Sequence, residues 1–361
     1  ICICREMRYK FSDLYYDDTK NAKKLKSSEY KNVGKYIIVD QGKSLIAGYT
    51  DNEDGLYTDV PAIIFGDHTR NIKYIDSPFF LGADGTKVLK SPLKSVNYKY
   101  LYYLLKNASI PDTGYNRHFK WVKELMFKYH SQEQQNQIVT ILDKLDSTII
   151  KYREELSLLD ELVRARFVEM FGDPVSNSKD LPIQKMNNVA PICQYDGSFE
   201  ERVWLLNLDM VESQTGRIIN YNIVGKDAIG GSVCTFDENN ILYSKLRPYL
   251  NKVVIPNGKG YATSELVPLR PDNKIINRIY LAYLLRSNEF VEMIKEKVAG
   301  AKMPRVSMSD FREFNVPVPP LEFQNQFASF VQEIDKSRSR IQKSLEASQE
   351  LFDSLMQEYF G

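Results

Sequence analysis

The chain has 361 residues, a charged fraction of 26% and a formal net charge of only +1. This length has room for two domains with separate cores, and the near-neutral balance excludes a globally basic nucleic-acid binder, so only local basic faces could serve DNA. No apolar run is long enough for a membrane span, no signal-peptide pattern is present, and the four cysteines are too scattered for a disulfide framework. We therefore expect a cytoplasmic protein without membrane contact.

Residues 1–130 are predicted to form a first globular domain built on short strands. Ile1 is not an initiator and Met7 is typical of a natural start, so residues 1–6 are expected to be peripheral. Leucine spacing predicts a helix over Tyr98–Asn107. Short apolar runs bounded by turn residues predict strands of a mixed or antiparallel sheet at Tyr36–Val39, Ala62–Phe65 and Phe79–Leu81.

Two polar loops of this domain are rich in hydrogen-bond donors. The loop Gly66–Arg70 directly follows an apolar strand and supplies His68, Thr69 and Arg70, and Gly114–His118 is a second such loop. Side chains of these types contact phosphates and base edges in nucleic-acid complexes. The residues alone leave two interpretations open for each loop, an ordinary surface turn or a binding loop.

Residues 131–172 carry the longest helical pattern in the chain. Apolar residues between Ile138 and Met170 follow the alternating three- and four-residue spacing of a coiled-coil seam. Ser131 is the expected N-cap, and Gly172 is the first glycine after it. A helix of this length would extend about 60 Å.

Residues 173–319 are predicted to form a second globular domain, which begins with a Pro- and Ser-containing linker. A helix is predicted over Asn277–Lys297. The predicted strands are Val203–Leu208, Arg217–Tyr221, Ile241–Ser244, Val253–Ile255 and Leu266–Leu269.

Two basic segments of the second domain are candidate binding loops. Ser244–Lys252 follows a buried-looking strand and contains Lys245, Arg247 and Tyr249, whereas Gly300–Ser307 contains Lys302 and Arg305. Both segments are also compatible with solvated surface loops, so the residues alone do not decide between binding and a purely structural role.

Residues 320–361 repeat the first long helix. Placing Gly361 on Gly172 gives an offset of 361 − 172 = 189, at which 42 positions align without a gap and 11 are identical, including a Gln-Asn-Gln triplet and the terminal Phe-Gly. Tyr100–Leu105 also matches Tyr280–Leu285 at an offset of 180. The predicted architecture is thus an α+β internal repeat with pseudo-two-fold character: domain, long helix, domain, long helix.

No catalytic or metal-binding motif is complete. Gly42-Lys43-Ser44 resembles the end of a phosphate-binding P-loop, but Ile37 occupies the position of its first glycine. No restriction-type acid-x-Lys spacing and no methyltransferase loop is present, and the three histidines lack metal-ligand spacing. We therefore expect no active site, no metal and no cofactor in this chain.

Several segments resemble the specificity subunit of Type I restriction-modification systems. They are Pro319–Phe327 at the start of the second long helix, the basic segments Ile241–Lys252 and Gly300–Ser307, and Pro61–Arg70. The first long helix departs from the family pattern, since His130 and Ser131 replace its two prolines.

The resemblance implies a division of labour. Residues 1–130 and 173–319 would be target recognition domains, each reading one half of a split double-stranded DNA site. Residues 131–172 and 320–361 would pack as an antiparallel coiled coil, a spacer that fixes the distance between the half-sites and docks partners. Those partners would be two methyltransferase subunits with S-adenosylmethionine and two restriction/translocase subunits with ATP and Mg.

These expectations assign residues to two kinds of surface. The expected DNA contacts are His68, Thr69, Arg70, Lys245, Arg247, Tyr249, Lys302 and Arg305. The residues expected to bury against one another between the long helices are Leu145, Leu156, Ile334, Ile341 and Leu345. The alternative is a non-catalytic protein-interaction scaffold built on a coiled coil, which the balanced net charge favours.

Overall fold

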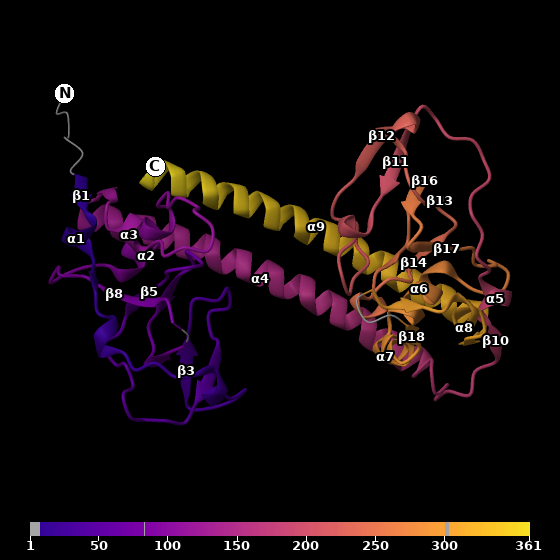
Figure 1. Cartoon of the computed structure of the whole chain (residues 1–361), viewed down its shortest axis with the longest axis horizontal. Helices are drawn as coiled ribbons and strands as arrows, with labels where there is room; N and C mark the ends of the chain where they lie inside the picture. The colour runs from indigo at the N-terminus through magenta and orange to yellow at the C-terminus, as the bar shows by residue number, and fades with distance from the viewer. Residues whose placement is uncertain (1–7, 83, 300–302) are drawn as a thin grey trace. The chain divides into compact units, whose positions relative to one another are not determined.

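The computed structural model describes residues 8–82, 84–299 and 303–361 (Figure 1). The expectations about residues 1–6 and about Lys302 lie outside the described residues. Packing divides the chain into two compact units. Unit 1 contains the chain up to Arg153 together with Lys343–Gly361, and unit 2 is Glu154–Gln342. Each unit therefore holds one globular part and a portion of both long helices. The four consecutive domains expected from the sequence remain a prediction.

The two long helices are α4, Gln132–Phe171, and α9, Leu321–Phe360, within a residue of their predicted ends. Ser131 begins α4 as predicted, because its hydroxyl accepts from the Gln134 N–H at 3.4 Å and its own N–H donates to the Gln134 side chain at 3.1 Å. Gly172 ends α4 with φ +70°, a conformation that glycine adopts without strain.

Unit 1 has two small sheets, ordered β2-β8-β5-β6 and β4-β3-β7, with the pair β1-β9 beside them. The strands are β1 Arg8–Lys10, β2 Tyr16–Asp17, β3 Tyr36–Val39, β4 Gly48–Thr50, β5 Ala62–Gly66, β6 Ile72–Ile75, β7 Phe79–Leu81, β8 Thr86–Lys90 and β9 Met126–Lys128. The helices of its globular part are α1 Phe11–Leu14, α2 Tyr98–Lys106 and α3 Phe119–Val122, with 3-10 turns at Thr19–Asn21 and Ser27–Glu29.

Unit 2 has sheets ordered β12-β11-β16-β13 and β15-β14-β17, with the pairs β10-β20 and β18-β19. Its strands are β10 Ile183–Lys185, β11 Arg202–Leu206, β12 Asn222–Gly225, β13 Val233–Phe236, β14 Ile241–Ser244, β15 Val253–Val254, β16 Gly260–Thr263, β17 Leu266–Leu269, β18 Val298–Ala299, β19 Arg305–Val306 and β20 Asn315–Pro317. Its shorter helices are α5 Met186–Val189, α6 Arg278–Arg286, α7 Asn288–Lys295 and α8 Met308–Arg312, with 3-10 turns at Leu208–Met210, Lys226–Ala228 and Pro248–Leu250.

The two units share the pairing pattern of their central strands, although their sheets differ in the number of strands. In each, a central buried strand, β5 or β14, pairs antiparallel with both neighbours. In each second sheet, β3 or β11 has one antiparallel and one parallel neighbour. The mixed sheets and the internal repeat predicted from the sequence are therefore confirmed.

Three framework hydrogen bonds recur in both units at corresponding positions. The first joins two side-chain amides, Asn97 to Asn136 at 3.2 Å in unit 1 and Asn277 to Asn325 at 2.9 Å in unit 2. The second runs from a tyrosine hydroxyl to a backbone carbonyl, Tyr100 to Lys128 at 3.4 Å and Tyr280 to Pro317 at 2.8 Å. The third runs from a glutamine amide to a backbone carbonyl, Gln135 to His130 at 2.8 Å and Gln324 to Pro319 at 2.7 Å. The donor residues are thus identical in the two units and bond corresponding acceptors, at the offset of 180 for Asn97 and Tyr100 and of 189 for Gln135, which composition alone would not produce.

Within each unit, opposite ends of the long helices pack together, as an antiparallel pair requires. In unit 1, the N-terminal half of α4 lies beside the C-terminal part of α9, and in unit 2 the remaining halves pair (Figure 1). The unit 1 core joins Ile138, Leu142 and Ile149 to Phe352 and Met356. The unit 2 core joins Val163, Phe167 and Phe171 to Phe327 and Val331.

The five residues predicted to bury between the helices have partial burial. Leu145 and Leu345 pack at the edge of the unit 1 core, and Ile334 packs at the edge of the unit 2 core. Leu156 and Ile341 are half-buried. Their contacts with one another remain a prediction.

Two predicted elements are wrong. Arg217–Tyr221 is not a strand, because left-handed residues Gln214 and Gly216 turn the chain there and β12 begins only at Asn222. The helix predicted over residues 277–297 is two helices, because the Ser287 hydroxyl accepts from the Phe290 N–H and starts α7. Among the described residues, no helix has the length and apolar character needed to cross a membrane.

Candidate functional site

Two loops meet in unit 1, and we name them the first loop pair: residues 67–71, between β5 and β6, and residues 111–118, before α3. Asp67 joins them, since its carbonyl accepts from the His118 N–H at 2.8 Å and its carboxylate accepts from the Phe119 N–H at 2.7 Å. Both Asp67 and His118 are buried. This buried polar contact fixes the two loops to each other, whereas most of residues 111–117 remain exposed.

His68 and Tyr115 present stacked rings on the first loop pair. Their ring centroids are 4.8 Å apart with planes inclined by 11°, and the His68 Nδ1 lies 3.2 Å from the Asn116 carbonyl oxygen. Tyr115 is 87% exposed. An exposed ring supported from behind can stack on a flat ligand such as a base.

Thr69 and Arg70 bond within the protein instead of pointing free into solvent. The Thr69 hydroxyl donates to the Gln41 carbonyl at 2.6 Å. Arg70 has left-handed backbone with φ 60°, and its guanidinium pairs with Asp112 at 2.6 Å and donates to the Ile110 carbonyl at 3.2 Å. These two side chains therefore stabilise the loops in the unbound protein.

The second loop pair, in unit 2, consists of residues 245–252, between β14 and β15, and residues 303–307, before α8. A bridge between Leu246 and Arg305 joins the loops. The Arg247 N–H donates to the Pro304 carbonyl at 2.8 Å, and the Val306 N–H donates to the Lys245 carbonyl at 3.0 Å.

Arg305 is held by a carboxylate. Its guanidinium forms a bidentate contact with Glu265, with nitrogen-oxygen distances of 2.7 to 3.2 Å. These hydrogen bonds lower the pKa of the Glu265 carboxyl and raise that of Arg305. Glu265 is mostly buried, while Arg305 is exposed. A charge-assisted pair of this kind orients the arginine along the loop.

Arg247 differs from Arg305 in having a free guanidinium. Its side chain is exposed, and no described residue makes a hydrogen bond or ion pair with that side chain. Tyr249 is 39% exposed two residues later, and Lys245 is half-buried. Arg247 has left-handed backbone with φ 49°, as Arg70 has in unit 1.

The two loop pairs correspond within the repeat. In each unit one loop follows the central buried strand and contains a left-handed arginine, and the other loop precedes the short helix that leads toward a long helix. The structure thus brings the sequence-predicted residues His68, Thr69 and Arg70 together in unit 1, and Lys245, Arg247, Tyr249 and Arg305 together in unit 2.

Two exposed residues of the first loop pair were not predicted individually. Tyr115 carries the stacked ring, and the Arg117 side chain has no hydrogen bond or ion pair with any described residue. Their polar loop was noticed in the sequence, but its position against residues 67–71 depends on the fold. Within the described ranges, no group of three His, Cys, Asp or Glu side chains is placed to hold a metal ion.

The chain matches a protein-family model described as Type I restriction modification DNA specificity domain, twice, over residues 11–158 and 209–349. It is 21% identical over 358 residues to the Type I restriction enzyme EcoR124I/EcoR124II specificity subunit of Escherichia coli, covering 91% of this chain and 86% of that protein. It is 27% identical over 135 residues to the EcoDI specificity subunit of the same organism, a match that covers 37% of this chain and only 30% of that protein.

Solved structures have the same fold. The S subunit of a type-I restriction-modification system from M. genitalium superposes with a TM-score of 0.60 at 16% identity, over 98% of this chain and 96% of that one. A chain from a study of complex assembly and conformational transition of the type I R-M system superposes with a TM-score of 0.52 at 13% identity, over 98% and 97%.

Proposed function

This chain belongs to the family of Type I restriction modification DNA specificity domains, and from that premise we propose that it is the non-catalytic subunit that reads a bipartite double-stranded DNA site. Each unit would read one half-site with its loop pair. The observation that carries this proposal is the recurrence of the loop pair: in both units a loop with a left-handed arginine follows the central strand, and a second loop precedes the short helix.

The exposed arginines supply the chemistry that DNA recognition needs. Arg117 and Arg247 make no hydrogen bond or ion pair with the described residues through their side chains, so each can reach a phosphate or the O6 and N7 acceptors of a guanine without first breaking an internal ion pair. Tyr115, stacked on His68, and the exposed Tyr249 add rings that can contact bases or sugars. These arginines and aromatic rings would supply the DNA contacts locally, so the proposal does not need a strongly positive net charge, and the chain has only +1.

The long helices would serve as spacer and docking surface for the partner subunits. Both helices expose large apolar side chains, which are Ile141, Ile150, Leu158, Leu162 and Val168 on α4 and Phe323 and Leu351 on α9. Exposed apolar groups gain stability when a partner covers them. We propose that two methyltransferase subunits, which bring S-adenosylmethionine, and two restriction/translocase subunits, which bring ATP and Mg, complete the assembly.

The test is a binding selection. The purified chain, together with its methyltransferase partner, is incubated with a library of random DNA duplexes, and the enriched fraction is sequenced. The proposal expects a split motif with a fixed gap. Salt-sensitive binding without an enriched motif would leave a non-specific DNA binder, and no binding at all would favour the interaction scaffold.

A further inference from the structure

Unit 2 contains a cavity of about 480 Å³ that lies outside both loop pairs. It lies among the C-terminal half of α4, the turn at residues 214–217, the junction of α6 and α7, and α9. Phe167, Ile218, Ile279 and Val331 contribute its apolar wall, and the side chains of Arg164 and Arg286 contribute positive charge. We call it the Arg286 pocket. Its volume falls in the range of small-molecule sites in proteins.

Arg286 is the unusual group of this pocket. Its Nε and Nη2 both donate to the Val253 carbonyl oxygen, at 3.1 and 2.6 Å, and its guanidinium lies 5.2 Å from the centre of the Tyr283 ring. No carboxylate of the described residues is within ion-pair distance of it. Burial accordingly lowers the pKa of Arg286. A desolvated cation whose bonded acceptor is a neutral carbonyl is incompletely compensated, and an anion would supply what it lacks.

The backbone is shaped to admit this arginine. Gly216 has φ +67°, and a Cβ there would lie 1.8 Å from the Val253 carbonyl oxygen and 2.7 Å from the Arg286 Nη2. A side chain at position 216 would therefore displace the guanidinium from its carbonyl. The turn just before Arg217–Tyr221, where the predicted strand does not form, is the same turn that makes room for Arg286.

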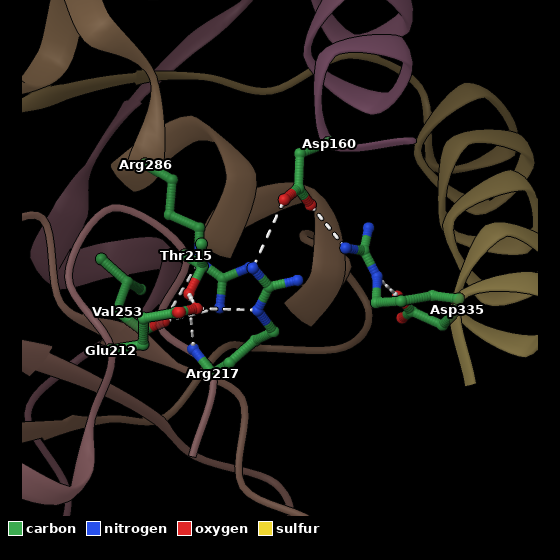
Figure 2. A network of polar contacts seen from close by, with 8 residues as sticks. Asp160, Glu212, Thr215, Arg217, Val253, Arg286 and Asp335 are labelled. Atoms are coloured by element: carbon green, nitrogen blue, oxygen red, sulfur yellow. Dashed lines mark hydrogen bonds and ion pairs between the residues drawn. The ribbon is translucent and has the colours of Figure 1, made fainter. Parts of the chain in front are cut away.

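Most of the other charged groups at the pocket form ion pairs with one another. Asp160 contacts Arg338 at 2.5 Å and Arg217 at 3.4 Å, and Arg338 also reaches Asp335 at 3.4 Å (Figure 2). Glu212 accepts from Arg217 at 2.8 Å. Asp160 and Asp335 act on Arg286 only from a distance, because each carboxylate of the network is bonded to Arg217 or Arg338 and none forms an ion pair with Arg286.

The charges left over favour an anion. Beyond the network, the lining holds Arg164, Arg286 and the carboxylate of Glu289. The N-terminus of α7, capped by Ser287, also borders the pocket and adds the positive end of a helix dipole. Glu289 opposes an anion. Counted over the whole lining, the four arginines Arg164, Arg217, Arg286 and Arg338 face the three carboxylates of Asp160, Glu289 and Asp335, so the pocket wall has a small positive excess to which the helix end adds.

Unit 1 indicates that the shared framework does not require such a pocket. Ile149, buried there, occupies the position that Arg338 has in unit 2, and Gln349 occupies that of Asp160. Lys106 corresponds to Arg286 and lies 5.3 Å from the centre of the Phe352 ring, which is itself buried in the unit 1 core. Unit 1 thus has a buried isoleucine in place of Arg338, and a glutamine that accepts from Arg153 at 3.2 Å in place of Asp160.

We propose that the Arg286 pocket binds a small amphipathic anion, whose carboxylate or phosphate contacts Arg286 and Arg164 and whose apolar body lies against Phe167, Ile218 and Ile279. The site is distinct from both loop pairs and does not rest on the DNA-recognition proposal.

The test uses the full-length chain and three probes: phenylacetate, phenylphosphate and the neutral, equally shaped phenylacetamide. Binding is measured by ligand-observed NMR and calorimetry at millimolar concentration. At least one anion should bind, and about tenfold more tightly than the amide, because a charge-assisted hydrogen bond is lost with the amide. The ranking of the two anions identifies the preferred headgroup.

Substitutions locate the binding. Arg286→Gln should abolish anion binding, and because this change also removes the bond to Val253, two milder variants accompany it. Arg164→Gln should weaken the anion about threefold, as expected for an exposed charge, and Glu289→Gln should tighten it about twofold. Arg312→Gln, at an exposed arginine of the same unit outside the pocket, is the matched control and should bind as wild type does.

The proposal fails if wild type binds none of the probes, if the amide binds as tightly as the anions, or if Arg164→Gln and Arg312→Gln cannot be told apart. These outcomes are independent of the DNA selection, so the pocket and the DNA-recognition proposal can fail separately.

Discussion

Unit 1 and unit 2 have the same hydrogen bonds where the globular part meets the start of a long helix. They have different side chains further along the same helices. The agreement comprises the framework bonds of Asn97, Tyr100 and Gln135, each with a counterpart in unit 2. The disagreement lies at the junction where unit 1 packs Ile149 and unit 2 places the charged network around Asp160. The two units therefore share the bonds that join the globular part to the start of its long helix, and they differ in charge at the helix junction further along.

The largest expected effect concerns the helices that both units share. We predict that removing or adding one heptad within Ile138–Phe167 changes the gap between the half-sites and leaves the recognised bases unchanged, since the loop pairs keep their own frameworks. Sequencing of DNA selected by the variant measures both quantities. A new base preference with the old gap would contradict this prediction.

A second prediction compares two equivalent glutamines. Gln324 bonds three backbone groups, accepting from the Asn277 N–H at 2.7 Å and donating to the Pro319 and Ile275 carbonyls. Gln135 makes one such bond, to the His130 carbonyl. Because removal leaves buried polar groups unpaired, Gln324→Ala should cost about 3 kcal/mol of unfolding free energy and Gln135→Ala about 1 kcal/mol.

Tryptophan fluorescence separates the two effects during urea unfolding, because the chain has two tryptophans and each unit holds one, Trp121 in unit 1 and Trp204 in unit 2. Single-tryptophan backgrounds report on one unit at a time. Equal losses for the two alanine variants would mean that the units are more alike than their hydrogen bonds indicate.

A third prediction converts the unit 2 junction into that of unit 1. Arg338→Ile alone should cost about 2 kcal/mol, because it leaves the half-buried Asp160 carboxylate with only its longer contact to Arg217. Adding Asp160→Gln, which completes the unit 1 residue pair, should recover about 1 kcal/mol of that loss. The Trp204 unfolding transition measures both. Strictly additive losses would show that the network does not act as a unit.

The smallest predicted effect concerns Arg305, the arginine of the second loop pair whose guanidinium is bonded to Glu265. Glu265→Gln releases Arg305 for a phosphate contact, so the slope of log binding constant against log salt should steepen by about one. Glu296→Gln, at an exposed carboxylate of the same unit, is the control and should leave the slope unchanged. An unchanged slope in both variants would place Arg305 away from DNA.

The same pair predicts a pH dependence of stability. Arg305 lowers the pKa of the Glu265 carboxyl below its ordinary value of 4.5, so the stabilisation is fully present above that pH and is lost as the pH falls through the lower, folded value. The difference in unfolding free energy between wild type and Glu265→Gln should therefore shrink below pH 4.5. A difference that stays constant through this range would contradict the pairing.

The long helices could be predicted from the sequence because the signals that specify them are local. The seam spacing, the Ser131 cap and the Gly172 end all lie within or next to the helical segment itself. The strand predicted at Arg217–Tyr221 failed because two left-handed residues just before it turn the chain. Arg305 was expected in a flexible basic loop, whereas the structure places it in strand β19, and its carboxylate partner lies 40 residues away in the sequence. Which donors are free and which are already bonded depends on such distant contacts, as does the Arg286 pocket.

The most direct test of the central claim, that each copy reads its own half-site, is the DNA selection repeated with Arg117→Asn and Arg247→Asn side by side. Asparagine is chosen because it tolerates the left-handed backbone at position 247. Each variant should relax the preference at one position or weaken binding overall, by about 1 to 3 kcal/mol if a guanine contact is lost. We predict that any relaxed positions fall in different half-sites for the two variants. Relaxation of the same half-site by both would contradict the account.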